Sequence, residues 1–283
     1  MTMMTYNQLA VPSFMYGTAW KKDATKGLVE LAVDSGFTAI DTANQLRHYY
    51  EIGVGEALLE LAKKGVKRES LFLQTKFTSI DGQGDHTPYD PKANLTTQVN
   101  QSIDSSLQHL HTDVLDSYVL HGPYTRYGLS DSDWEVWAAI EDQYKKGKTK
   151  SIGVSNVTAE QLALLVSNAK VKPMFCQNRC YAVRGWDKDV RKICLAENII
   201  YQGFSLLTAN AREMADPAVR AIAQRLGTGV EQVIFKFSMQ IGMLPLTGTS
   251  NASHMKEDLS SEKLTLTDQD MHLIENIGLS AHR

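Results

Sequence analysis

Three ionisable side chains each stand directly after a short apolar run, where a buried strand is expected to end. Asp41 follows Thr-Ala-Ile, Lys76 follows Leu-Phe-Leu-Gln-Thr, and His121 follows Tyr-Val-Leu. Each has a purely structural interpretation: a helix cap for Asp41, a solvated charge for Lys76, and a backbone-bonded side chain for His121. Three such groups at neighbouring strand ends favour a shared site, because charges that are buried together must be paired.

The loop after Asp41 adds a phenol, since it contains the adjacent residues Tyr49 and Tyr50. A free phenol has a pKa of about 10. A lysine ammonium about 4 Å away lowers that pKa, whereas desolvation of the phenolate raises it. We expect the net effect to bring the pKa of the phenol toward neutral, where a general acid is most useful. With Asp41 holding Lys76 in place and His121 orienting a carbonyl oxygen, the set suits carbonyl reduction.

Short β-rich runs that alternate with longer amphipathic segments must position these side chains. Several of the runs are continuously apolar, which is typical of parallel strands covered on both faces. The eight expected strands begin near Phe14, Phe37, Leu71, Leu115, Thr149, Met174, Ile199 and Met243.

Helical patterns fill the intervals between the expected strands. The clearest is a stripe of apolar residues at spacings of three and four from Leu95 to Leu110. Gly36, Gly65 and Gly147 stand where glycines commonly end helices. Weaker helical patterns cover residues 24–35, 51–63, 133–144, 160–166, 188–197 and 217–226.

This alternation, without a Pro/Gly/Ser-rich linker, predicts an α/β fold: a (β/α)8 TIM barrel with residues 1–283 as a single domain. An open doubly wound sheet is the alternative, although a chain of this length would then usually carry a second domain. Two loops, 79–92 and 122–130, are longer than turns require. In a barrel, the loops that follow strands line the active-site face, and these two loops follow the third and fourth strands.

The composition narrows the class of protein. The 283 residues carry 29 Lys and Arg against 32 Asp and Glu, a net charge of −3, so we expect no nucleic-acid partner. The longest uncharged stretch, residues 237–255, is interrupted by polar residues throughout, so we expect no membrane segment. The start of the chain lacks the features of a secretory signal. The three cysteines fit neither a disulfide framework nor a metal site, so we expect free thiols, no metal and a cytoplasmic protein.

Five segments in order along nearly the whole chain resemble the aldo-keto reductases. They are GFTAIDTA, LFLQTKF, YVLHGP, KTKSIGVSNV and MFCQNRC. The resemblance implies a (β/α)8 barrel, a nicotinamide cofactor bound without a glycine-rich fingerprint, and a tyrosine as proton donor. It assigns the catalytic aspartate, lysine and histidine of the family to Asp41, Lys76 and His121.

The family tyrosine normally lies five residues after the aspartate, where this chain has Leu46. We therefore assign the proton donor to Tyr49, with Tyr50 as the alternative. Gly122 replaces a tryptophan that often follows the histidine in related enzymes, which implies an open pocket that accepts varied or bulky carbonyls. Trp20 resembles a substrate-pocket aromatic, with a hydrophobic lid on the barrel as the alternative interpretation.

The resemblance also implies a set of cofactor-binding residues. Ser155, Asn156 and Gln177 match the residues that hold the carboxamide, with Phe204 stacked under the nicotinamide and Ser205 beside the phosphates. Residues that match the segment gripping the adenosine half are Thr249, Ser250, His254, Glu257 and Asp258. Gly248 and His254 stand where enzymes that use NADPH generally carry a lysine and an arginine for the 2′-phosphate, and Lys256 is the only lysine close by. We expect NADPH, with NADH possible.

These observations predict reduction of an aldehyde or ketone by hydride transfer, with tyrosine as general acid. The expected partner is a small-molecule carbonyl substrate, and the expected state is a monomer or a weak homodimer. Two alternatives remain. One is a non-catalytic dinucleotide-binding regulatory subunit, and the other is an aldolase-like lyase that forms a Schiff base on Lys76.

Overall fold

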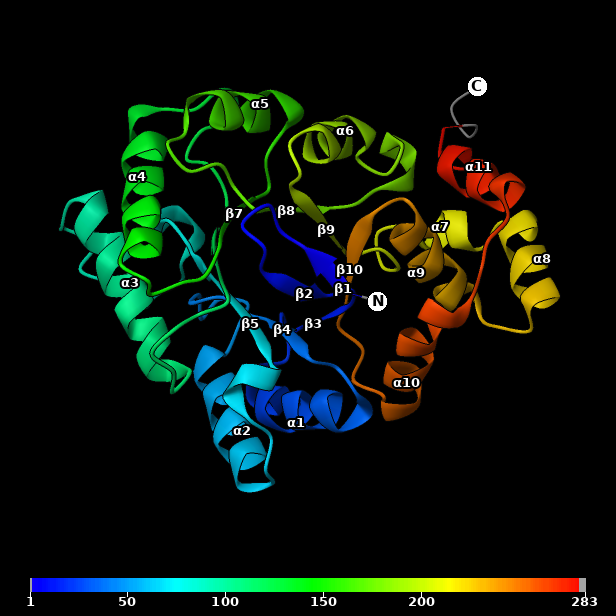
Figure 1. The fold of residues 1–283 in the computed structure, drawn as a ribbon, viewed down its shortest axis with the longest axis horizontal. Coiled ribbons are helices and arrows are strands. Elements are labelled where there is room, and N and C mark those ends of the chain that lie inside the picture. Colours follow the sequence, from blue (N-terminus) through cyan, green and yellow to red (C-terminus); the bar gives the residue numbers. More distant parts are fainter. Residues whose placement is uncertain (1, 280–283) are drawn as a thin grey trace.

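Eight short parallel strands close into a barrel in the computed structural model, which describes residues 2–279 (Figure 1). In chain order they are β3 (Met15–Gly17), β4 (Ala39–Asp41), β5 (Phe72–Phe77), β6 (Ser117–Leu120), β7 (Ile152–Ser155), β8 (Phe175–Arg179), β9 (Ile200–Phe204) and β10 (Met243–Thr247). Each strand pairs with the next, and β10 closes the barrel on β3. All eight predicted strands are present, so the predicted (β/α)8 barrel is confirmed.

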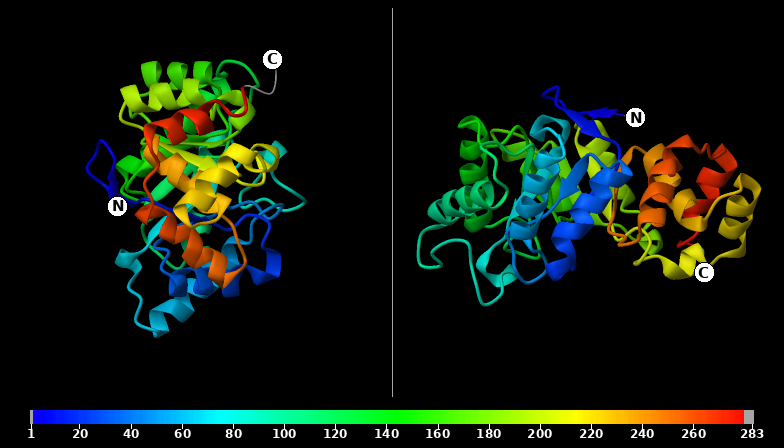
Figure 2. Two further views of the ribbon diagram at one scale, coloured as in Figure 1. Left: turned by 90° about the vertical axis from the view of Figure 1, so that its right-hand side faces the viewer. Right: turned by 90° about the horizontal axis from the view of Figure 1, so that it is seen from below.

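Helices surround the barrel and cover its outer face (Figures 1 and 2). They are α1 (Thr25–Ser35), α2 (Glu51–Lys63), α3 (Leu95–His109), α4 (Asp131–Lys145), α5 (Ala159–Asn168), α6 (Lys188–Ala196), α7 (Ala211–Met214), α8 (Pro217–Leu226), α9 (Val230–Gln240), α10 (Ala252–Ser260) and α11 (Asp268–Asn276). Short 3-10 turns occupy Lys22–Ala24, Arg68–Ser70, Ile80–Gly82, Ala182–Arg184 and Ser261–Lys263. All six residues of β5 are buried, as expected for a strand packed on both faces.

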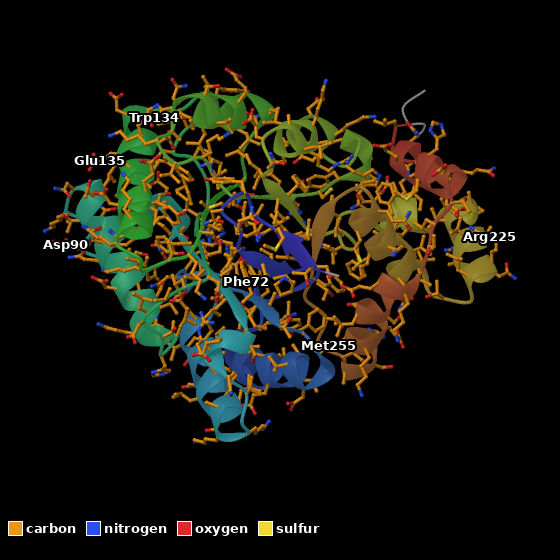
Figure 3. The ribbon with its side chains drawn as sticks, viewed as in Figure 1. Phe72, Asp90, Trp134, Glu135, Arg225 and Met255 are labelled. Atoms are coloured by element: carbon orange, nitrogen blue, oxygen red, sulfur yellow. The ribbon has the colours of Figure 1, made fainter. Side chains whose placement is uncertain are left out.

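Apolar side chains pack in the interior of the molecule, and most charged side chains lie at its surface (Figure 3). Phe72 lies near the middle of that view and its ring contacts Phe175 edge-on at 5.8 Å between centroids. Arg225 lies at the outer edge on α8, where its guanidinium binds the Asp270 carboxylate of α11 at 2.6 Å. The apolar core therefore includes the barrel interior, and the ion pair joins helices at the periphery.

The predicted helix-ending glycines adopt the left-handed backbone that an L side chain resists. The φ angles are 114° at Gly36, 91° at Gly65 and 76° at Gly147. Gly36 caps α1 by donating its N–H to the carbonyls of Ala32 and Val33. These glycines turn the chain from each helix toward the next strand.

The sequence patterns did not identify the helices α9 to α11. In α9 the side chains of Val233, Ile234, Phe235 and Phe237 are all buried, whereas Glu231 and Gln240 are exposed. Apolar residues at helical spacing were therefore present in α9, at positions 230, 233, 234 and 237. Within residues 2–279, no helix is both long and apolar enough to cross a membrane.

A two-stranded antiparallel hairpin, β1 (Thr2–Met4) and β2 (Ala10–Pro12), was also not predicted. Its Tyr6 hydroxyl donates to the Lys172 carbonyl at 2.5 Å, and Asn7 donates to the Lys150 carbonyl at 3.0 Å. Both acceptors precede barrel strands, so the hairpin lies over the end where the strands begin (Figures 1 and 2). The opposite end, where the strands finish, stays open for a site.

Candidate active site

A buried ion pair joins the ends of the neighbouring strands β4 and β5. The Lys76 Nζ donates to both Asp41 carboxylate oxygens at 2.7 Å and to the Thr42 carbonyl at 2.7 Å. Neither side chain is appreciably exposed. Burial lowers the pKa of Lys76, and the charge of Asp41 opposes that effect. Because an ammonium has three N–H donors, these contacts use all of them.

Glutamine side chains inside the barrel hold the carboxylate from its other side. Gln74 and Gln177 donate to the Asp41 Oδ1 at 2.7 and 3.2 Å. The Gln202 Oε1 accepts from the same two amides, at 2.8 Å from Gln74 and 2.9 Å from Gln177. Sequence reasoning missed Gln74 and Gln202. A usable signal was present, because Gln74 stands two residues before Lys76 in an apolar strand and so shares its face.

Tyr49, and not Tyr50, faces this ion pair. The Lys76 Nζ lies 5.1 Å from the centroid of the Tyr49 ring, and the Tyr49 and His121 rings meet edge-on at 5.8 Å. The Tyr50 ring instead packs on α2, so closely that a Cβ added at Gly53 would lie 2.6 Å from the Tyr50 Cδ1. The structure therefore brings Tyr49 together with Asp41, Lys76 and His121.

The electrostatic expectation for the phenol is wrong in sign. Burial raises the pKa of Tyr49, and the negative charge of Asp41 raises it further. The reason is that the Lys76 ammonium is in contact with the Asp41 carboxylate. The pair has no net charge, so desolvation of the phenolate dominates. Tyr49 consequently keeps its proton throughout the physiological pH range.

His121 lies directly after β6 and is held on two sides. Its backbone N–H donates to the Phe77 carbonyl at 2.9 Å, and its Nδ1 is hydrogen-bonded to the Thr78 hydroxyl at 2.7 Å. Burial lowers the pKa of His121 to about 3, with smaller contributions from Lys76 and His48. The imidazole is therefore neutral at neutral pH and has one N–H to offer.

A cavity of about 530 Å³ opens at this end of the barrel and brings most of the predicted site residues together. At one end it is lined by Trp20, Asp41, Tyr49 and His121. The predicted cofactor residues that line it are Ser155, Asn156, Gln177, Phe204, Ser205, Thr249, His254, Glu257 and Asp258. Ser250 lies outside the lining, and Lys76 is buried behind Asp41.

The polar residues near His121 are held by hydrogen bonds between neighbouring strand ends. The Ser155 hydroxyl donates to the Gln177 carbonyl at 2.6 Å, and the Asn156 amide donates to the His121 carbonyl at 2.8 Å. Asn156 and Ser205 both have left-handed backbones, with φ of 58° and 56°. Such conformations are costly away from glycine and concentrate at functional sites.

The far end of the cavity, toward α10, is rich in carboxylates. Asp258 accepts from the Thr247 hydroxyl at 2.8 Å, and burial raises its pKa to about 6. Glu231, on α9, and Glu257 also line this end, and His254 is close enough to Asp258 to act on its pKa. The Lys21 ammonium hydrogen-bonds the Gly248 carbonyl.

Comparison with known proteins identifies the family. The sequence profile of the Aldo/keto reductase family matches residues 12–278. The chain belongs to the aldo-keto reductase family.

Its relatives include an NADPH-dependent alpha-keto amide reductase of Saccharomyces cerevisiae, 27% identical over 93% of this chain and 85% of that protein. A glyoxal reductase of Bacillus subtilis (strain 168) is 27% identical over 98% of this aldo-keto reductase and 92% of the relative. The crystal structure of an aldo-keto reductase of the silkworm, Bombyx mori, complexed with NADPH has a TM-score of 0.84 and 25% identity, covering 98% of this chain and 87% of that one. These relatives agree with membership of a family of oxidoreductases, and the silkworm structure has the same fold as this chain.

The cysteines and the acidic residues of this aldo-keto reductase form no further centre in the part of the chain that the structure describes. Cys176, Cys180 and Cys194 are buried free thiols. Among the described residues, no group of three or more His, Cys, Asp or Glu is placed to hold a metal ion.

Proposed function

We propose that this aldo-keto reductase reduces an aldehyde or ketone to an alcohol, with Tyr49 as the proton donor. The observation that carries the proposal is the convergence of the Tyr49 phenol, the His121 imidazole and the Asp41–Lys76 ion pair at one end of the cavity. The relatives described as a glyoxal reductase and an alpha-keto amide reductase act on carbonyl compounds, which supports the same reaction class.

The chain supplies the proton and the polar surroundings of the oxygen atom. As a hydride adds to the carbonyl carbon, the C=O π electrons move to the oxygen, and the Tyr49 hydroxyl transfers its proton there. His121 donates a hydrogen bond to the same oxygen, and preorganised donors of this kind are usually the largest electrostatic contribution to catalysis. Tyr49 lines the cavity, so a solvent proton can return to the phenolate once the alcohol has left.

The residues along the cavity fit a nicotinamide dinucleotide. Asn156 and Gln177 offer amide groups beside the phenol, and Phe204 offers an aromatic face. A reduced nicotinamide dinucleotide is the source of the hydride that this chemistry needs. Such a cofactor would occupy the cavity from these amides to α10.

We propose NADPH as the cofactor with only weak discrimination against NADH. Besides the neutral His121, the basic side chains that line the cavity are His254 and Lys21, whereas Glu231, Glu257 and Asp258 are acidic. Carboxylates near an additional phosphate oppose its binding by like-charge repulsion. A silkworm relative complexed with NADPH and a yeast relative described as NADPH-dependent support the phosphorylated form.

We propose that the substrates are bulky and apolar. Trp20, Leu46, Ile80 and Tyr127 are exposed apolar side chains, and all four lie in loops that follow strands β3 to β6. The Trp20 ring packs against His48 in a tilted arrangement at 4.2 Å between centroids, which ties two of these loops together. Gly122 leaves the position after His121 without a side chain, next to Asn156 and Ser155. An open apolar rim of this kind favours large apolar groups on the carbonyl.

The geometry gives the Schiff-base alternative no support. An amine that attacks a carbonyl must lose a proton and reach the substrate. Lys76 is fully buried, does not line the cavity, and uses its three N–H groups on Asp41 and Thr42.

A panel of aldehydes and ketones tests the proposed reaction, with absorbance of NADPH and then NADH as the measurement. We expect oxidation of either cofactor with bulky apolar carbonyls, and a rate at least about a hundredfold lower in the Tyr49→Phe variant. Binding that quenches cofactor fluorescence without any oxidation across the panel would instead identify a regulatory dinucleotide-binding protein. A substrate adduct trapped by borohydride would support the alternative of a lyase that forms a Schiff base on Lys76.

A further inference from the structure

Thr78 and His121 are opposite each other at the ends of adjacent strands. Phe77 pairs with Leu120 in the β5–β6 register, so the next residues of the two strands meet at the mouth of the barrel. The Thr78 hydroxyl lies 2.7 Å from the His121 Nδ1. Thr78 is 4% exposed and does not line the cavity, so it acts on the site only through His121.

Thr78 is packed closely at its backbone and at its methyl group. Its carbonyl accepts from the Tyr89 hydroxyl at 2.7 Å and from the Gln83 amide at 3.3 Å. A Cβ added at Gly82 would lie 2.7 Å from the Thr78 Cγ2, so the lack of a side chain at Gly82 leaves room for the methyl group. The main chain of Thr78 is thus fixed beside the imidazole that its hydroxyl contacts.

The donors and acceptors available to Thr78 and His121 decide which of the two donates the hydrogen bond. In the described part of the chain, the Thr78 hydroxyl has no hydrogen-bond partner other than the His121 Nδ1. If Nδ1 carried the hydrogen, the hydroxyl proton would be buried without an acceptor, which costs about 1–3 kcal/mol. If the hydroxyl donates, every donor of the pair is satisfied. A neutral imidazole carries one hydrogen, which is then on Nε2.

We infer that Thr78 is a positioning residue that donates its hydroxyl hydrogen to the His121 Nδ1 and so fixes the tautomer whose Nε2–H faces the substrate carbonyl. The inference rests on the proposed carbonyl reduction for its catalytic consequence, but not for the tautomer itself. Without the hydroxyl, either ring nitrogen can carry the hydrogen. In the wrong tautomer an unprotonated Nε2 repels the carbonyl oxygen.

The tautomer is measured by nitrogen NMR on the whole protein labelled in its histidines, with His121→Gln identifying the resonances. We expect an unprotonated Nδ1 and a protonated Nε2 in the native protein. A protonated Nδ1 there overturns the inference, whatever the activity of the enzyme and whatever any variant does to folding.

The catalytic consequence is tested with Thr78→Val, which keeps the shape, and Thr78→Ser, which restores a hydroxyl. Only molecules with a protonated Nε2 keep the oxyanion donor, whose loss costs about a hundredfold or more. The kcat should therefore fall in proportion to the fraction of molecules in the wrong tautomer, about twofold when the two tautomers are equally populated. We expect Thr78→Val to show this loss with unchanged cofactor binding, and Thr78→Ser to recover most of it. Native kcat in Thr78→Val, or no recovery in Thr78→Ser, overturns the positioning role.

The two failures are distinguishable. If the native protein reduces no carbonyl but its nitrogen spectrum shows the expected tautomer, the proposed function fails and the assignment of the Thr78 hydrogen bond is supported. If the native protein is an active reductase with a protonated Nδ1, the proposed function is supported and the assignment of the Thr78 hydrogen bond fails.

Discussion

At the scale of single residues, the site depends on the identity of the phenol and on the ion pair behind it. Tyr49 faces Lys76 and His121, whereas Tyr50 packs on Gly53 of α2. Lys76 is paired so closely with Asp41 that it keeps the carboxylate in place without making the phenol acidic. A protonated, neutral Tyr49 is therefore the resting state of the acid.

Tyr49→Phe removes the proton donor and leaves the ring. We expect turnover to fall by at least about a hundredfold, since a positioned acid contributes about 10²–10⁴-fold. Cofactor binding, followed by fluorescence quenching, should stay unchanged. Tyr50→Phe is the matched control, one residue along the same loop, and should keep near-native turnover. The opposite result, with Tyr50→Phe inactive and Tyr49→Phe active, would transfer the role to Tyr50.

Lys76→Met leaves the Asp41 carboxylate buried without its cation. We expect loss of turnover and about 3–5 kcal/mol less free energy of unfolding, measured by urea denaturation, because an uncompensated buried charge is costly. The double variant Asp41→Asn with Lys76→Met should recover part of the stability and none of the turnover. If Lys76→Met is as stable as the native chain, removing the cation from the ion pair does not destabilise the fold as expected.

At the scale of elements, the loop between β6 and α4 begins at His121 and is held by a buried carboxylate. The Asp133 Oδ1 accepts from the Tyr124 N–H at 2.7 Å, and its Oδ2 accepts from the N–H and hydroxyl of Ser130 at 2.7 Å. The Gln161 amide of α5 holds the same loop through the carbonyls of Thr125 and Gly128. A helix cap thus also holds the loop that follows His121.

Asp133→Ala should lower the free energy of unfolding by about 2–3 kcal/mol, because it leaves the N–H groups of Tyr124 and Ser130 without an acceptor. Asp131→Ala is the matched control in the same helical turn. Asp131 is exposed, so only its interaction with the helix dipole is lost, worth about 0.3–1 kcal/mol. Equal losses in the two variants, measured by urea denaturation, would contradict the role of Asp133.

Gly122→Trp should narrow the substrate range. A Cβ at this position meets only ordinary contacts, at 3.7 Å from the Asn156 Cβ and 3.8 Å from the Ser155 carbonyl, so a side chain fits at its base. We expect kcat/KM for bulky ketones to fall about tenfold or more while small aldehydes are spared, because steric exclusion acts on the larger substrate. Gly122→Ala is the control and should behave like the native chain. A uniform change for all substrates would argue against an open wall.

At the scale of the whole molecule, two groups of the site make the free energy of unfolding depend on pH, in opposite directions. The folded pKa of His121 is about 3, against an ordinary value of 6.5. Its stabilising contribution is fully present above pH 6.5 and is lost as the pH falls toward 3. The folded pKa of Asp258 is about 6, against 3.8. Its contribution is present below pH 3.8 and is lost as the pH rises through 6.

Urea denaturation between about pH 4 and about pH 7 tests both signs. His121→Gln should reduce the rise of the unfolding free energy with increasing pH, because the unfolded state then no longer takes up that proton. Asp258→Asn should make the rise steeper, because the folded state then no longer binds a proton that the unfolded state has released. The same change of slope in both variants would contradict these pKa shifts.

The sequence by itself determined the barrel and the positions of Asp41, Lys76 and His121 at its strand ends. Continuous apolar runs and helical periodicity are local patterns, so they identify elements without knowledge of what packs against them. A local pattern was missed in α9, whose apolar residues at 230, 233, 234 and 237 follow the helical period, whereas the hairpin β1–β2 is too short for a periodic pattern.

Only the tertiary structure decided which tyrosine faces the lysine, the direction of the phenol's pKa shift, and the contacts made by Thr78 and Gln74. Tyr49 and Tyr50 differ only in the path of their loop, and the hydrogen bond from Gln74 to Gln202 joins residues 128 positions apart. Such contacts exist only once the barrel has closed. Desolvation depends in the same way on everything that surrounds a group, which is why composition and spacing predicted the participants of the site but not their electrostatics.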